Sequence, residues 1–167
     1  MFIILESLPK EYIPMHNVML ETAKGTTQID HIVVSPYGVF VIETKNYKGW
    51  IYGKADEYYW TQALSGKNNR FYSPIKQNEG HINALKRIVG NVPFHSIVVF
   101  SDTCELKTKP NGVIYESELQ NTINAYRSVV LTKEQVHRVE TAILGENIID
   151  RESREGHTEN LRSRYGR

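Results

Sequence analysis

Two runs in the first third of the chain are so uniformly apolar that neither leaves a hydrophilic face. Residues 29–34 and 39–42 consist of Ile, Val and Phe apart from two polar positions near the start of the first run. Strands that are apolar on both faces are typical of the middle of a sheet. The Ser-Pro-Tyr-Gly sequence between the runs, Ser35–Gly38, is a turn signal. The pattern therefore predicts a hairpin of two central strands over Gln28–Lys45.

Shorter apolar or periodic segments surround this hairpin. They predict strands at Val18–Glu21, Trp50–Tyr52, Tyr58–Thr61, Ser96–Phe100 and Val113–Tyr115, a polar loop at Leu64–Arg70, and helices at Phe2–Leu8, Ser117–Tyr126 and Thr132–Leu144. A longer helix is predicted from Ser73 to about Val89, because Ser is a good N-cap and Pro follows it at the first helical position. This order predicts an α/β fold of three layers, with a central mixed sheet flanked by helices.

Three charged residues interrupt the apolar hairpin. If the turn closes without a bulge, Val34 pairs with Val39, and Asp30 then lies opposite Glu43 with the two Cβ atoms roughly 5 Å apart. Lys45 is two residues beyond Glu43, so it points to the same side of the sheet. The register therefore predicts that two carboxylates and an ammonium group converge on one face.

Two carboxylates at that separation repel each other unless a proton or a cation lies between them. A hard divalent cation such as Mg²⁺ suits oxygen ligands and commonly keeps waters and a phosphate oxygen. The ammonium group of Lys45 could stabilise charge on a phosphoryl oxygen or activate a water. A structural ion pair between Asp30 and Lys45 is the alternative, but it would leave Glu43 as a second negative charge. The pattern favours phosphodiester hydrolysis.

The long helix adds two polar candidates, Gln77 and His81, which lie four residues apart on one face. Gln77 could hold the attacking water or a phosphate. His81 is an auxiliary candidate for proton transfer, and the alternative is a partly exposed histidine without a catalytic role. His31 alternates to the face opposite Asp30, so it is read as a hydrogen-bonded core histidine.

The sequence around these residues resembles a known family. The Asp-x12-Glu-Thr-Lys spacing is similar to the signature of PD-(D/E)xK nucleases. The segments QIDHIVVSPYGVFVIETKNYKGWIYG, SPIKQNEGHINAL and SIVVFSD resemble the nuclease-related domain, NERD, from about Leu5 to about Leu144. The resemblance implies a restriction-endonuclease-like fold and a single domain over residues 1–147, followed by a polar, frayed tail over 148–167.

The same resemblance assigns roles to individual residues. It implies that Asp30 and Glu43 bind Mg²⁺ or Mn²⁺, that Lys45 is the catalytic lysine, and that Gln77 is a further polar residue of the site. Relatives usually carry a Gly-Glu pair in a longer N-terminal helix, and this chain lacks it. Either Glu6 or Glu21 substitutes for that glutamate, or the activity is lost.

Composition and charge indicate which class of binding partner the protein has. The 167 residues fit one domain and carry a net charge of only +1. Between Glu43 and Arg87, however, eight Lys and Arg residues face four acids, a local balance of 8 − 4 = +4. Aromatic residues interleave with basic ones there, which suits nucleic acid. The predicted contacts are Lys48, Lys54, Lys67, Arg70 and Lys76, whereas Trp50 and Trp60 are expected to pack on the sheet.

The single cysteine, Cys104, excludes an intramolecular disulfide and favours a reducing compartment. The N-terminal apolar run is short and lacks a basic segment, so it predicts neither a signal peptide nor a membrane span. We therefore expect a cytoplasmic protein without membrane association, and the pattern leaves the oligomeric state open.

The sequence thus favours a metal-dependent DNA nuclease. The first alternative is a catalytically inactive module of nuclease fold that binds nucleic acid without a metal. The second is a structural or protein-interaction domain.

Overall fold

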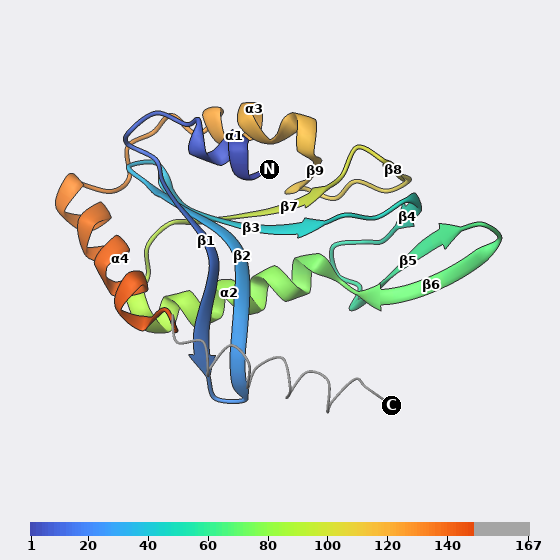
Figure 1. Ribbon diagram of the computed structural model, residues 1–167, viewed down its shortest axis with the longest axis horizontal. Helices are drawn as coiled ribbons and strands as arrows, with labels where there is room; N and C mark the ends of the chain where they lie inside the picture. Colours follow the sequence, from blue (N-terminus) through green and yellow to red (C-terminus); the bar gives the residue numbers. More distant parts are fainter. Residues whose placement is uncertain (149–167) are drawn as a thin grey trace.

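The protein is built around a five-stranded mixed sheet with helices on both faces (Figure 1). The computed structural model describes residues 1–148. The strand order is β1-β2-β3-β7-β9. These strands are β1 (Ile13–Thr22), β2 (Gly25–Ser35), β3 (Gly38–Lys45), β7 (Phe94–Phe100) and β9 (Val113–Tyr115). Helices α2 (Pro74–Val89) and α4 (Lys133–Glu146) cover one face, and α1 (Phe2–Glu6) and α3 (Leu119–Asn124) the other. The predicted three-layer α/β class is confirmed.

The central hairpin forms in the predicted register. Val34 lies opposite Val39, and His31 lies opposite Ile42, so the turn closes without a bulge. On its other side β3 pairs with β7 in parallel, which makes the sheet mixed. Because β3 has a strand on each side and packed helices over both faces, its residues from Gly38 to Glu43 are all buried. This arrangement explains the uniformly apolar sequence of the strand.

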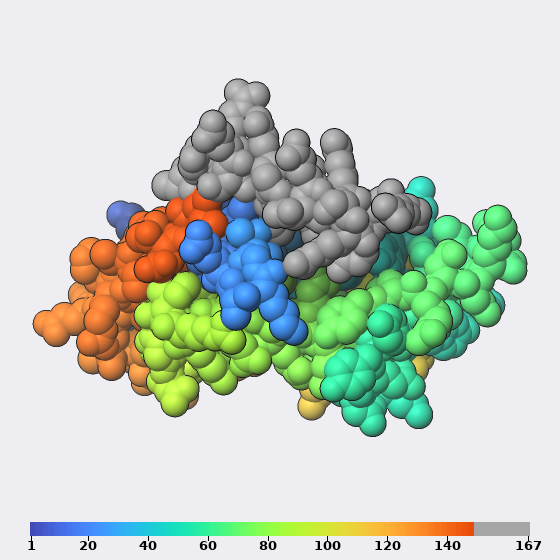
Figure 2. All heavy atoms as spheres, turned by 90° about the horizontal axis from the view of Figure 1, so that it is seen from below, coloured from blue at the N-terminus to red at the C-terminus, as the bar shows by residue number. Residues whose placement is uncertain are grey.

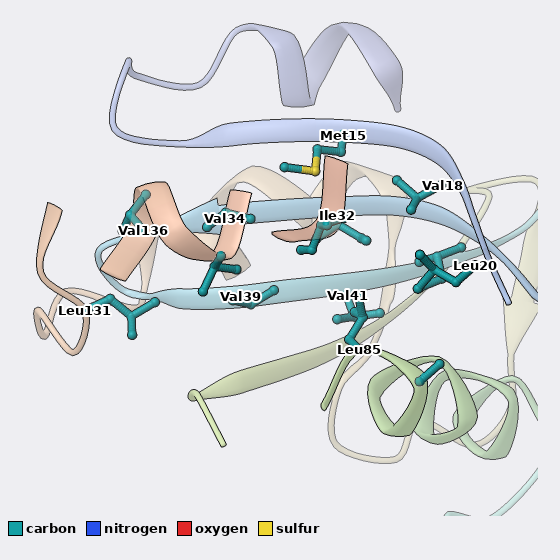
Figure 3. Packing of buried hydrophobic residues seen from close by; sticks show 14 residues of the cluster. Met15, Val18, Leu20, Ile32, Val34, Val39, Val41, Leu85, Leu131 and Val136 are labelled. Carbon is teal, nitrogen blue, oxygen red and sulfur yellow. The ribbon is translucent and has the colours of Figure 1, made fainter. Parts of the chain in front are cut away.

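A large apolar cluster fills most of the space between the sheet and helices α2 and α4. Figure 3 shows side chains from β1, β2 and β3 meeting Leu85 of α2 and Val136 of α4. Burial of such side chains contributes roughly 1.5–3 kcal/mol each, so this layer dominates the stability of the sheet–helix contact. Glu43 follows these residues on the same face of β3, and its position is therefore at the edge of this core.

A second sheet of four strands was not predicted as such. Its order is β6-β5-β4-β8, formed by β4 (Gly49–Tyr52), β5 (Tyr59–Leu64), β6 (Lys67–Tyr72) and β8 (Cys104–Leu106). The predicted loop at Leu64–Arg70 is wrong, because only Ser65 and Gly66 form a turn and β6 pairs antiparallel with β5. Both turn residues have positive φ angles, 53° and 75°. Two such residues close a tight hairpin, and pairing with β5 outweighs the low strand propensity of a polar segment.

Trp60 joins the two sheets. Its side chain is 1% exposed and stacks on Phe100 of β7 with ring centroids 6.1 Å apart. Gly53 leaves room for it, since a Cβ atom at that position would lie 2.0 Å from the indole ring. Trp60 thus packs as predicted, but the same prediction for Trp50 is wrong. Trp50 is 50% exposed, because it alternates with buried Ile51 and faces away from the central sheet.

Smaller differences between the predicted and the observed secondary structure occur at the ends of helices and strands. Strand β1 begins at Ile13 instead of Val18, and the predicted helix at Ser117–Tyr126 is a 3-10 turn, η1 (Glu116–Glu118), followed by α3. The predicted cap of α4 is confirmed, because Thr132 and Gln135 form a capping box. Of the predicted polar tail at 148–167, all but the first residue lies outside the described residues. None of the helices over residues 1–148 is long and apolar enough to cross a membrane.

Asn78 ties α2 to the central sheet. Its side chain is fully buried, and its Nδ2 donates to the carbonyl oxygen of Val41 at 2.8 Å and to Oγ of Ser96 at 2.9 Å. Two hydrogen bonds to two different strands set the depth and rotation of the helix. They also determine where the neighbouring Gln77 and His81 side chains lie.

We predict that Asn78→Ala lowers the free energy of unfolding by about 1–3 kcal/mol, because it removes the donor to the buried carbonyl oxygen of Val41 and a second hydrogen bond to Ser96. Urea denaturation followed by circular dichroism measures this. Asn83→Ala, on the exposed side of the same helix, is the matched control and is expected to change stability by no more than about 0.5 kcal/mol. Equal stabilities of the two variants would contradict this role for Asn78.

Candidate functional site

The polar groups of the central hairpin meet α2 at the carboxyl end of β3. Glu43 is 3% exposed, and its Oε1 lies 3.0 Å from Nζ of Lys45. The same Nζ donates to Oε1 of Gln77 at 3.0 Å. The structure therefore connects a strand carboxylate, a strand ammonium group and a helix amide in one continuous chain of contacts. These three groups were all predicted from the sequence.

Asp30 completes the hairpin side of the site. Asp30 lies one position beyond the end of the β2–β3 ladder, whose last pair is His31 with Ile42. Continuing the same register puts Asp30 opposite Glu43. Its Oδ2 accepts hydrogen bonds from the backbone N–H and the Oγ1 hydroxyl of Thr44, at 2.9 and 2.8 Å. These bonds hold the carboxylate against the end of β3. No sequence pattern marks Thr44 as a residue of the site. Its role in holding Asp30 follows only from these two hydrogen bonds.

Burial disfavours the charge on Glu43. Desolvation, together with repulsion from Asp30, raises the pKa of Glu43 to about 7, although Lys45 opposes the shift. Its Oε2 is buried and has no hydrogen-bond partner among the described residues. A buried carboxylate oxygen without a partner is costly, and a proton or a bound cation removes that cost.

His81 lies beside this oxygen, and the expectation that it is partly exposed is wrong. It is 3% exposed, with Nδ1 3.7 Å from Oε2 of Glu43 and 3.4 Å from Oδ1 of Asn78. Burial lowers the pKa of His81 to about 4. The imidazole is therefore neutral at physiological pH, and its approach to Glu43 is not an ion pair. The helix turns this position towards the sheet because Asn78, one turn earlier, is anchored there.

The two substitutes considered for the missing N-terminal glutamate lie elsewhere. Glu6 contacts Nε2 of His16 at 2.7 Å, and His16 contacts His31 at 2.7 Å on the α1 side of the sheet. His31 thus faces away from Asp30, as predicted. Glu21 is exposed and pairs with Thr26 in the outer part of the β1–β2 hairpin. Neither Glu6 nor Glu21 joins the carboxylates of Asp30 and Glu43.

The donors present fit a hard divalent cation in type. Two carboxylates, one with an unpaired buried oxygen, and the nearby amide oxygen of Gln77 are all oxygen ligands. Among the described residues, however, no group of three or more His, Cys, Asp or Glu side chains is arranged to hold a metal. An ion held by Asp30 and Glu43 would need further ligands from water or from a phosphate, as is usual for Mg²⁺.

The predicted nucleic-acid contacts lie on the second sheet and on the first turn of α2. Lys48, Lys54, Lys67 and Arg70 are exposed around the four-stranded sheet. Lys76 is half-buried in α2, with Nζ 3.3 Å from Oε2 of Glu79 and 5.5 Å from the ring centre of Tyr58. Lys76 immediately precedes Gln77 in the chain, and so it is the one of the five adjacent in sequence to a residue of the site.

Comparison with known proteins identifies the class. Residues 2–101 match the family model of the nuclease-related domain, NERD, which covers more than half of the chain. The chain belongs to the NERD family, and the family name is consistent with the PD-(D/E)xK superfamily. An uncharacterized protein of Bacillus anthracis is 39% identical over 166 residues, which cover 95% of this chain and 78% of that protein. No solved structure matches the fold significantly.

The raised pKa of Glu43 predicts a pH-dependent stability in metal-free protein. The pKa of Glu43 is about 7 in the folded protein, against 4.5 for an ordinary glutamate. Between these two pH values the folded protein therefore retains a proton that the unfolded chain releases. Stability relative to Glu43→Gln is therefore highest below pH 4.5 and falls as the pH rises to about 7, by on the order of 2–3 kcal/mol. The lowered pKa of His81 acts in the opposite direction, but it is common to both proteins.

Urea denaturation in EDTA at several pH values measures this difference. Glu79→Gln, which removes an exposed carboxylate from α2, is the control and should track the wild type at every pH. If wild type and Glu43→Gln differ by the same amount throughout, Glu43 is ionised in the folded protein and the argument from burial fails.

Proposed function

We propose that the protein is a Mg²⁺- or Mn²⁺-dependent nuclease that hydrolyses phosphodiester bonds in DNA. The observation that carries the proposal is the buried Oε2 of Glu43, which has no hydrogen-bond partner among the described residues and lies beside a second carboxylate. A structural role alone would not require two carboxylates inside an apolar hairpin. Membership of the NERD family supports a nuclease-related activity.

Asp30 and Glu43 would hold the metal ion. Bound there, a divalent ion would polarise the scissile phosphate and lower the pKa of an attacking water. Asp30 is already oriented by its two bonds to Thr44, so it needs no rearrangement to act as a ligand. For Glu43, metal binding would replace the proton that its environment favours.

Lys45 and Gln77 would act on the substrate. The ammonium group of Lys45 has three N–H donors, of which Glu43 and Gln77 accept two. The third has no acceptor within residues 1–148 and would donate to a non-bridging phosphoryl oxygen, where it would stabilise the negative charge that develops during hydrolysis. Gln77 holds the lysine through its Oε1, so its own amide N–H groups can orient a phosphate or a water. His81 would act as a positioning residue for Glu43.

DNA is the expected substrate, because basic and aromatic residues surround the site in the sequence. The cytoplasm is the expected location, because Cys104 is a free thiol and a reducing compartment suits it. A second candidate function is a nucleic-acid-binding module without catalysis. It is favoured by the number of carboxylates at the site, since among residues 1–148 only Asp30 and Glu43 come together there and Glu6 contacts His16 instead. This module would bind DNA in a salt-dependent manner without any divalent ion.

Asp30→Asn separates the two candidates. The amide retains an oxygen for the Thr44 bonds but removes the charge, so we expect Mg²⁺ and Mn²⁺ binding to be lost while the fold is kept. Isothermal titration of each ion measures binding, and cleavage of supercoiled plasmid measures activity. Loss of one charged ligand should reduce cleavage by at least about a hundredfold.

Asp102→Asn is the matched control. Asp102 also accepts a backbone N–H and a hydroxyl, both from Ser117, but lies outside the site. It should bind metal and cleave plasmid like the wild type. Wild-type DNA binding without metal binding or nicking would overturn the nuclease proposal and support the inactive module.

A further inference from the structure

Four exposed aromatic side chains share the outer face of the four-stranded sheet. Trp50, Tyr52, Tyr59 and Tyr72 are 50%, 39%, 54% and 46% exposed. Tyr59 lies directly opposite Tyr72, and Tyr52 pairs with Thr61, two residues beyond Tyr59. Since side chains alternate along a strand, all four rings point away from the core, while the intervening Trp60 packs into it.

Positive groups lie over these rings. The guanidinium carbon of Arg70 is 4.5 Å from the ring centre of Tyr59, and Nζ of Lys107 is 4.4 Å from that of Trp50. Glu105 offsets part of this charge, because it contacts Lys107 at 2.5 Å. Such cation–π contacts place positive charge directly over one face of the Tyr59 ring and one face of the Trp50 ring. The sequence reading did not identify Lys107.

A hollow of about 400 Å³ lies at the end of this face. Trp50 forms one wall, and the β5–β6 turn forms the other through Leu64, Ser65 and Asn68. The hollow is in the size range of small-molecule sites, and Ser65, Lys67 and Asn68 supply hydrogen-bonding side chains to its lining. An aromatic wall with polar groups opposite is suited to a flat heterocycle with polar edges.

We propose that the outer face of β4–β6 binds single-stranded DNA, with bases stacked on Trp50, Tyr52, Tyr59 and Tyr72 and one base in the hollow beside Trp50. Aromatic side chains stack on bases only when the bases are unpaired, whereas a duplex offers phosphates and groove edges. The flanking Arg70 and Lys107 match the backbone phosphates in charge.

A short stretch of chain joins the stacking face to the helix that carries Gln77 of the candidate catalytic site. Strand β6 continues through Ser73 into α2, and the backbone N–H of Ser73 donates to the carbonyl oxygen of Tyr58 at 2.8 Å. Lys76, in the next turn, lies over the Tyr58 ring and precedes Gln77. Figure 2 shows side chains of α2 and of residues 45–72 side by side on one face of the molecule. Resting on the proposed function, the substrate is DNA with a single-stranded segment next to the scissile bond.

Fluorescence anisotropy in EDTA tests the binding face separately from catalysis. The probes are a labelled single strand of about 12 nucleotides, the blunt duplex of the same sequence, and the corresponding RNA strand. We expect the wild type to bind single-stranded DNA most tightly. Trp50→Ala and Tyr59→Ala should each weaken that binding by about fivefold or more, because each removes a stacking surface.

Conservative variants and a distant control make the result specific. Trp50→Phe and Tyr59→Phe retain a ring and should keep most of the affinity. Leu144→Ala removes an apolar side chain of α4 that is 51% exposed and should have no effect. Tighter binding of duplex or RNA than of single-stranded DNA, or unchanged binding by both alanine variants, would overturn the inference.

A parallel cleavage assay with Mg²⁺ compares a blunt duplex with the same duplex carrying a single-stranded tail. Preferred cleavage of the tailed DNA that Trp50→Ala abolishes supports the inference. Equal cleavage of both substrates, unaffected by Trp50→Ala, overturns it while the proposed nuclease function stands. If no DNA is cleaved but Trp50-dependent binding of the single strand persists, the nuclease function fails and the binding face stands.

Discussion

The carboxylate of Glu43 is the group on which the organisation of the site depends. It occupies a strand with neighbours on both sides, where water is excluded and the charged form is disfavoured. Lys45, which also donates to Gln77, contacts one of its oxygens, and His81 approaches the other. A buried acid with only partial compensation has a cost in stability, and proteins retain such groups where a ligand or a reaction uses them. This cost is the physical link between the fold and the proposed metal site.

The central hairpin and α2 act together to assemble the site. The hairpin register brings Asp30 opposite Glu43, and the parallel pairing with β7 keeps β3 in the interior. Asn78 then anchors the helix to both of these strands, which turns its polar residues towards the end of β3. Each donor is therefore supported by a rigid element instead of a loop. Such support is what metal ligands and general acid–base groups require.

The four-stranded sheet separates the aromatic residues by alternation. Trp60 and Phe71 face inwards, where Trp60 stacks on Phe100 and joins the two sheets. Trp50 and Tyr59 face outwards, under Lys107 and Arg70. One small sheet thus serves two purposes, since its inner face stabilises the end of the central sheet and its outer face presents the proposed stacking surface. Both faces adjoin the chain segment that enters α2.

Features that depend on local pattern could be predicted from the amino-acid sequence. The hairpin register followed from two apolar runs and a turn, the start of α2 from Ser73 and Pro74, and the grouping of Asp30, Glu43 and Lys45 from strand alternation. Which face of each element packs against another depends instead on the three-dimensional arrangement of the elements. His81 is buried because α2 is anchored through Asn78, Lys67–Tyr72 is a strand because β5 pairs with it, and Trp50 is exposed because the core lies on the other side of β4. Such outcomes depend on contacts between segments distant in the chain, which periodicity within one segment does not encode.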